Sequence, residues 1–246
     1  MNIRLLDLYS DYLLSSFSAT TATGFSSLMG NEISHDQVSR MLNSRQLEPK
    51  DWWLMVKPHV RSVQSEDGVI VIDDSIVEKP YTDENEIICW HYDHAKGRTV
   101  KGINFITSLY ATQEVSLPVT FRLVAKTEQY IDKKGKPKRR SAVTKNEHYR
   151  EMLQQCVRNQ IPFQYVLNDL WFASAENMRF VKLDLKKEFI MALKSNRKVA
   201  LSAEDKQNGR YQRLDQLDVP EDTLTVIHLE QVSFPLHLLR QVFTNA

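Results

Sequence analysis

The feature that most constrains the fold is the stretch DGVIVIDDSIVEKP at residues 67–80, where an apolar run meets two carboxylates. Val69 to Ile72 are four consecutive apolar β-branched residues, which is typical of a buried strand. Asp73 and Asp74 follow without a break. The stretch leaves two interpretations open: a turn that happens to use aspartate, or a metal site at the end of a rigid strand.

The hydrophobic period changes at this point in the chain. Residues 1–62 are expected to be helical, because apolar residues recur at helical spacing in LLDLYSDYLL. The stretch SSLMGNEISHDQVSRMLNS predicts two short helices around a Gly-Asn break, with Ser34 as N-cap and Gln37 at the capping-box position. This outline indicates a helix-turn-helix that could enter a DNA groove, and any small three-helix bundle is the alternative. A further helix is expected to end at Pro58.

Beyond residue 68 the sequence favours strands. KGINFITSLYAT, SLPVTFRLVAK, PFQYVLND and EFIMALKS are rich in β-branched and aromatic residues. Helices are predicted between the later strands, one after N-cap Thr144 and one starting at Ser174. Three strands followed by helix, strand, helix, strand predict an α/β core over residues 67–197, with a partial β insertion over residues 198–246.

This order of elements predicts that two aspartates far apart in the chain lie close in space. The first strand belongs in the middle of the sheet beside the fourth, so Asp74 and Asp169 would meet at neighbouring strand ends, where ligands of α/β sheets gather. Converging carboxylates repel each other, and a divalent cation such as Mg²⁺ or Mn²⁺ relieves that repulsion. Asp73 points to the opposite face and is the expected supporting residue, although it remains a rival for the role.

A second charged feature is the basic stretch DKKGKPKRRSAVTK at residues 132–145, which has a net charge of +6 in a chain of net charge +1. Gly135 and Pro137 predict a solvated loop. Basic side chains there can bind a DNA backbone without reading its sequence, although many exposed basic residues only face solvent. The candidate phosphate contacts are Lys133, Lys134, Lys136, Lys138, Arg139 and Arg140, with Arg98 and Lys101 as further candidates.

Composition restricts the remaining choices. No apolar run approaches the roughly 18 residues of a membrane span. Two cysteines give no disulfide framework, so we expect a cytoplasmic protein without membrane contact. His91 and His94 resemble a metal pair, but no Cys/His set of structural spacing accompanies them, and a loop near nucleic acid is the favoured interpretation.

Taken together, the motifs are similar to those of bacterial insertion-sequence transposases of the DDE class. The similar stretches are VIDDSIVEKPYTDENEIICWHYDHAKGRTVKGIN and YVLNDLWFAS, preceded by LLDLYSDYL and ISHDQVSRML. The resemblance covers essentially the whole chain. It implies an RNase H-like catalytic domain, with Asp74 and Asp169 as catalytic carboxylates that hold Mg²⁺ or Mn²⁺. It also implies DNA as partner, in the form of terminal repeats and target, and a homodimer in a synaptic complex.

The family's third carboxylate is a glutamate on a late helix, in the pattern Y-x-x-x-W-x-x-E, and no glutamate after Asp169 matches it. We therefore expect a chain truncated before that residue, with an incomplete β insertion and no activity alone. The alternative is a catalytically dead DNA-binding protein that occupies transposon ends or inhibits the full-length transposase. A nuclease of the same fold unrelated to transposition is a third interpretation.

Overall fold

The computed structural model describes residues 3–17, 20–44, 48–113 and 115–242, and the chain divides into two compact units, Met1–Asp51 and Trp52–Ala246. The first unit consists of three helices, α1 (Ile3–Ser15), α2 (Ala22–Leu28) and α3 (His35–Asn43). Aromatic rings from α1 and α2 fill its core, as in the edge-on contact of Tyr9 with Phe25 at 5.4 Å between ring centroids. The predicted capping box at Ser34 and Gln37 is confirmed.

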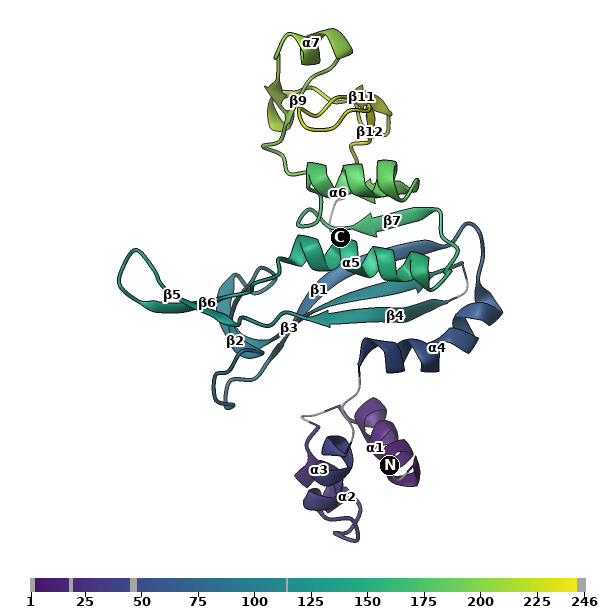
Figure 1. Cartoon of the computed structure of the whole chain (residues 1–246), viewed down its shortest axis with the longest axis vertical. Helices are drawn as coiled ribbons and strands as arrows, with labels where there is room; N and C mark the ends of the chain where they lie inside the picture. The colour runs from purple at the N-terminus through teal and green to yellow at the C-terminus, as the bar shows by residue number, and fades with distance from the viewer. Residues whose placement is uncertain (1–2, 18–19, 45–47, 114, 243–246) are drawn as a thin grey trace. The chain divides into compact units, whose positions relative to one another are not determined.

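The second unit is built on a six-stranded mixed sheet (Figure 1). The main path runs β2-β3-β1-β7-β8, and β4 pairs with β3. Strand β1 pairs antiparallel with β3 and parallel with β7, so its predicted place beside the fourth expected strand is confirmed. The strands are β1 (Val69–Glu78), β2 (Ile88–Asp93), β3 (Arg98–Ala111), β4 (Ser116–Leu123), β7 (Tyr165–Asn168) and β8 (Glu188–Met191).

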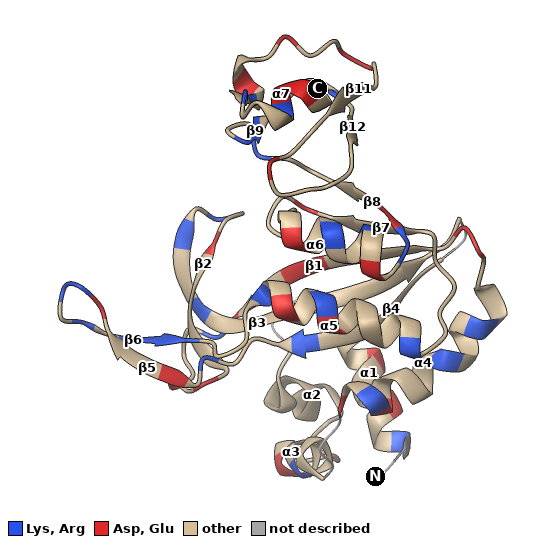
Figure 2. Ribbon diagram, turned by 45° about the horizontal axis from the view of Figure 1, so that its top comes forward, with Lys and Arg blue, Asp and Glu red and all other residues tan. Residues whose placement is uncertain are grey.

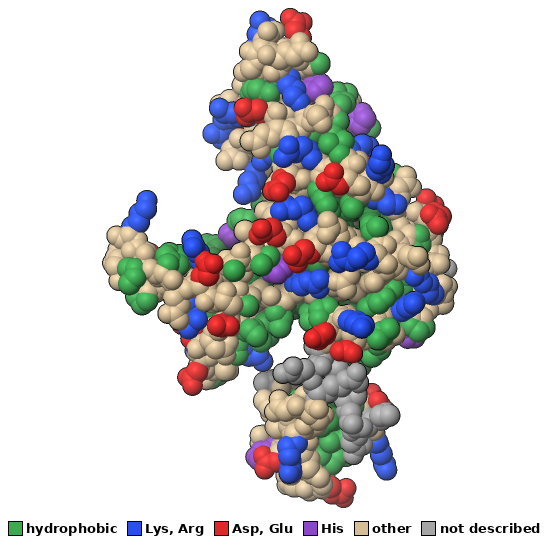
Figure 3. Space-filling model, in the orientation of Figure 1, with side chains coloured by type: hydrophobic (Ala, Val, Ile, Leu, Met, Phe, Trp, Pro, Cys, Tyr) green, Lys and Arg blue, Asp and Glu red, His purple; other side chains and the backbone are tan. Residues whose placement is uncertain are grey.

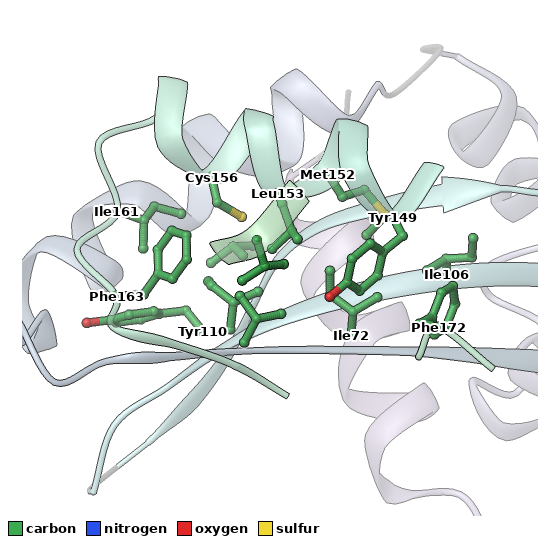
Figure 4. Close-up of a cluster of buried hydrophobic side chains, with 14 of the residues drawn as sticks. Ile72, Ile106, Tyr110, Tyr149, Met152, Leu153, Cys156, Ile161, Phe163 and Phe172 are labelled. Carbon is green, nitrogen blue, oxygen red and sulfur yellow. The ribbon is translucent and has the colours of Figure 1, made fainter. Parts of the chain in front are cut away.

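Helices α5 (Lys145–Arg158) and α6 (Ala175–Arg179), the latter continued by the π-helical turn η1 (Phe180–Asp184), follow the order expected from the sequence. The capping box of Thr144 with Glu147 fixes the start of α5. Below α5 the apolar residues of the helix and the sheet form one core, and Figure 4 shows Met152 and Leu153 of the helix above Ile72 of β1. The ring of Tyr149 stacks on Phe172 at 5.2 Å.

Three expectations about these elements are wrong. The helix expected to end at Pro58 continues as α4 (Pro49–Val63), because Val56 and Val60 are buried in the core on both sides of the proline. The first strand does not end at Asp74 but continues to Glu78, because β3 pairs with it along its whole length. Strand β2 was not expected at all, since its sequence ICWHYD places a histidine in a buried position.

The remaining chain forms small two-stranded pairs, β9 (Lys198–Val199) with β10 (Gln212–Arg213) and β11 (Thr225–Ile227) with β12 (Leu236–Leu238). The short helices α7 (Ala203–Gln207) and η2 (Leu214–Gln216) lie between them in sequence. A second apolar cluster, which includes Val199, Ile227 and Met178, joins this part to α6. Within the described chain, no helix is long and apolar enough to cross a membrane.

Candidate active site

The two predicted carboxylates lie where the parallel pairing of β1 with β7 stops. The last pair in that register is Ile72 with Asn168. Asp73 and Asp74 continue along β1, whereas Asp169 leaves β7 and enters the following turn. The structure therefore brings the carboxylates together at one place on the sheet, at the end of β7 rather than at the end of β1.

Asp74 is held by two nitrogen donors. Its side chain lies on the same face of β1 as the buried Ile72, two residues away, because strand side chains alternate. The Oδ2 atom accepts a hydrogen bond from Asn104 Nδ2 at 3.0 Å and from Lys145 Nζ at 2.6 Å. Asn104 is 1% exposed, so its amide fixes the carboxylate from inside the protein.

Asp169 experiences the negative charge of its neighbours. Burial raises the pKa of its carboxyl, the backbone N–H of Trp171 opposes that rise, and the charges of Asp73 and Asp74 raise the pKa further. The Trp171 N–H donates to Asp169 Oδ1 at 2.9 Å, which fixes the turn after β7. The mutual repulsion of these aspartates is the condition that a bound cation relieves.

Asp73 remains a rival of Asp74 in this geometry. Its side chain is exposed on the other face of β1, and its Oδ1 accepts a hydrogen bond from the Asp74 backbone N–H at 2.8 Å. Both aspartates act on the pKa of Asp169. The choice of Asp74 as the metal ligand therefore stays a prediction.

The available ligands fit a hard divalent cation. Mg²⁺ in proteins is commonly bound by one or two carboxylates, with water and substrate phosphates completing its coordination. Asp74 and Asp169 supply such carboxylates; burial is the main cause of the raised pKa of Asp169, and the charges of Asp73 and Asp74 add to it. Residues 3–17, 20–44, 48–113 and 115–242 contain no cluster of three or more His, Cys, Asp or Glu side chains suited to a metal ion.

The late glutamates do not complete the site within the described part of the chain. Glu176 opens α6 and pairs with Arg150 at 3.2 Å. Glu188 begins β8 and pairs with Lys182 at 2.5 Å. Both glutamates pair with basic side chains other than the one that contacts Asp74, and no glutamate after Asp169 stands in the sequence pattern that the resemblance requires.

The basic stretch forms a β-hairpin instead of the expected loop. Strands β5 (Glu128–Ile131) and β6 (Pro137–Arg140) pair with each other and project from the sheet, and Figure 2 shows basic residues along β6 and its turn. Gln129, Tyr130 and Ile131 pair with Arg139, Lys138 and Pro137, and Gly135 adopts the positive φ of 75° that the turn needs. The expected loop was wrong because Gly135 and Pro137 mark only the turn and the start of β6.

The hairpin divides the predicted DNA contacts into two groups. In the first group, each basic side chain of β6 forms an ion pair: Lys138 with Asp132 at 3.0 Å, Arg140 with Glu128 at 2.7 Å, and Arg139 with Glu84 at 3.5 Å. No carboxylate partner is found among the described residues for the exposed side chains of the turn, Lys133, Lys134 and Lys136. The turn lysines are therefore the more available of the predicted phosphate contacts.

The other two predicted contacts lie on β3. Arg98 pairs with Glu78 at 2.9 Å and Lys101 is half-buried in register with Trp90 of β2. On the face that Figure 3 shows, basic and acidic side chains are interspersed, which matches the near-neutral net charge. Arg98 and Lys101 therefore lie on the internal strand β3, where Arg98 is already paired with an acidic side chain.

The two histidines do not form a pair. His91 is buried, and its Nε2 lies 3.3 Å from Cys89 Sγ. Burial lowers the pKa of His91 to about 4, and the charges of Lys126 and Lys145 add to that effect. His94 is exposed and its ring contacts Tyr92 and Trp171.

An aromatic row beside Asp169 was missed by the sequence analysis. The ring centroids of Tyr92 and His94 lie 4.6 Å apart, and those of His94 and Trp171 lie 4.3 Å apart. Lys194 Nζ lies 4.6 Å from the Trp171 ring centroid. Tyr92 and Trp171 are 54% and 44% exposed, so these rings lie at the protein surface and not in the core.

A mixed sheet with one aspartate on β1 and another directly after the adjacent parallel strand β7 is the arrangement of RNase H-like nucleases. The chain belongs to the DDE superfamily endonuclease family, whose model matches residues 3–241. The match confirms the resemblance to DDE-class enzymes and gives no support to the expected truncation. Neither a curated protein nor a solved structure matches the chain.

Proposed function

We infer that this chain is a transposase that cleaves and joins DNA strands at the ends of an insertion sequence. The observation that carries the proposal is the meeting of Asp74 and Asp169 where β7 stops pairing with β1. Family membership supports an endonuclease acting on DNA. The carboxylates would hold Mg²⁺ or Mn²⁺, which when bound activates a water or a 3′-hydroxyl and stabilises the leaving oxygen of a phosphodiester.

Several residues of the chain would hold the DNA. Lys133, Lys134 and Lys136 in the β5–β6 turn would neutralise backbone phosphates, and the helix-turn-helix outline of α2 and α3 would read the ends. The exposed ring of Trp171 would stack on a base close to Asp169. Asn104 would keep Asp74 oriented throughout. Two copies in a synaptic complex would bring both ends together, and two free cysteines favour a reducing, cytoplasmic setting.

The test is nicking of a supercoiled plasmid that carries the DNA flanking the gene, in Mg²⁺ or Mn²⁺. Wild type should nick the plasmid slowly, because the third carboxylate expected from the resemblance was not found in the sequence, and Asp169→Asn should reduce that rate by a further roughly 10²- to 10³-fold. Nicking that survives in Asp169→Asn would refute the assignment of the site.

The second candidate function is a DNA-binding protein without catalysis that occupies transposon ends. It is favoured by the engagement of Glu176 and Glu188 in ion pairs away from the aspartates. It predicts that wild type binds end DNA but nicks nothing, and that Asp74→Ala leaves DNA affinity unchanged. Measuring DNA affinity by fluorescence anisotropy beside the nicking assay separates the two candidates.

A further inference from the structure

The side chain closest to the candidate metal ligand is a lysine. Lys145 Nζ lies 2.6 Å from Asp74 Oδ2, the same oxygen that accepts from Asn104. The side chain of Asp74 is 16% exposed and that of Lys145 is 40% exposed. The ion pair therefore lies at the protein surface, where an incoming ligand can reach the ammonium group.

The position of Lys145 is fixed by its backbone and not by its side chain. It is the first residue of α5, which the reciprocal hydrogen bonds between Thr144 and Glu147 hold at 3.2 and 2.6 Å. The next residue, Asn146, accepts a hydrogen bond from the buried Asn177 at 2.8 Å. The start of the helix is thus anchored, while the four-carbon stem of Lys145 can swing.

A lysine is an unfavourable choice for this position in isolation. The first turn of a helix carries partial positive charge and favours acidic residues, so a cation there is destabilising unless a partner compensates. Asp74 is that partner. Lys126 lies near enough that its charge and that of Lys145 both lower the pKa of His91. Lys126 and Lys145 also act on each other's surroundings through their charges, so this part of the protein, in which one lysine is paired with Asp74, favours the approach of an anion and opposes the approach of a further cation.

We propose that Lys145 couples metal binding to DNA binding: it pairs with Asp74 in the free protein and transfers to a DNA phosphate when the substrate arrives. The transfer leaves Asp74 Oδ2 free for the divalent cation. This inference rests on the proposed function, in which Asp74 is a metal ligand and DNA is the substrate. Because coupling between two ligands is reciprocal, the cation must raise DNA affinity by the same factor as DNA raises cation affinity.

The experiment measures Mn²⁺ affinity from the electron paramagnetic resonance signal of free Mn²⁺, with and without a short DNA duplex, at constant ionic strength. For wild type, DNA should tighten Mn²⁺ binding by roughly tenfold, within the usual range of such couplings. Without DNA, Lys145→Met should bind Mn²⁺ about tenfold more tightly than wild type does. Adding DNA should then change the Mn²⁺ affinity of this variant very little. Lys145→Arg keeps the charge and should behave as wild type.

A matched control is Lys182→Met, which removes a lysine paired with Glu188 away from the aspartates and should match wild type in Mn²⁺ affinity. Equal or weaker Mn²⁺ binding by folded Lys145→Met, or a DNA effect that persists in it, would overturn the coupling. The Asp74→Asn variant distinguishes a failure of the metal assignment from a failure of the coupling. If Asp74→Asn binds Mn²⁺ as wild type does, the metal assignment of the proposed function fails. If it loses Mn²⁺ while Lys145→Met changes nothing, only the coupling fails.

Discussion

Replacing Asn104 with leucine should weaken metal binding while leaving stability nearly unchanged. Asn104 Nδ2 donates to Asp74 Oδ2 at 3.0 Å, and a hydrogen bond to a charged group contributes roughly 1.5–3 kcal/mol. Its other amide atom, Oδ1, is buried and has no hydrogen-bond partner among the residues that the structure describes, which costs about 1–3 kcal/mol. Leucine removes both, so the two contributions largely cancel in the free energy of unfolding. With a few degrees of Tm per kcal/mol, we expect a Tm shift of less than about 6 °C.

The effect on the site should be much larger, because Asp74 loses the buried donor that orients it. Loss of such an outer hydrogen bond typically reduces metal affinity by roughly 10- to 100-fold. Mn²⁺ binding and thermal unfolding by circular dichroism measure the two quantities on the same sample. Ser108→Ala is the matched control, since Ser108 is buried on the same face of β3 and its hydroxyl hydrogen-bonds with Cys156 Sγ at 3.8 Å and not with Asp74. A fall in Tm well beyond 6 °C with unchanged Mn²⁺ affinity would refute the reasoning.

Three further predictions concern DNA contacts and pH. Replacing the turn lysines 133, 134 and 136 with methionine should lower the slope of log affinity against log salt by about 3, measured by anisotropy on duplex DNA, because each phosphate contact contributes about 0.9 to that slope. An unchanged slope would show that the hairpin does not touch DNA. Trp171→Ala should weaken binding of a single-stranded oligonucleotide by roughly 5- to 100-fold, whereas Trp90→Ala, also exposed but outside the aromatic row, should not. Equal effects of the two substitutions would contradict stacking at Trp171. Burial lowers the pKa of His91 to about 4, so its imidazole stays neutral in the folded protein down to that pH. In the unfolded chain the same histidine takes up a proton below its ordinary pKa of 6.5. The free energy of unfolding should therefore fall between pH 6.5 and 4, by at most about 3 kcal/mol. Measured by urea unfolding, the His91→Leu variant should lose less stability over that pH range than wild type. An equal loss in both proteins would show that other groups cause the pH dependence.

The arrangement of β1 beside β7 could be predicted because the order of strands and helices permits few sheets. The capping boxes at Ser34 and Thr144 could be predicted because the cap and its partner are three residues apart in sequence. In each case the information is local or follows from the order of elements. Family membership could likewise be predicted from the motifs around the two aspartates.

The contacts that surround Asp74 could not be predicted, because they depend on strand register and on the direction of one flexible side chain. Asn104 reaches Asp74 diagonally across β1 and β3, in a register that pairs Asn104 with Ile76. The sequence marks Asn104 only as a polar residue within an apolar strand. Strand β2 was missed since Cys89 and His91 alternate with exposed Trp90 and Tyr92, a pattern in which the more hydrophobic residues face solvent.

The unequal lengths of β1 and β7 determine how the site is exposed. Strand β1 has ten residues and β7 has four, so no described strand covers the second edge of β1 from Asp73 onward. Ile72, still paired with β7, is buried, whereas Asp74 two residues later is reachable from solvent. If β7 were longer, Asp169 would join its ladder and could not accept the hydrogen bond of Trp171 that now fixes it in a turn. The rigid strand therefore positions one carboxylate and the turn supplies the other, and both stay partly exposed at the end of β7.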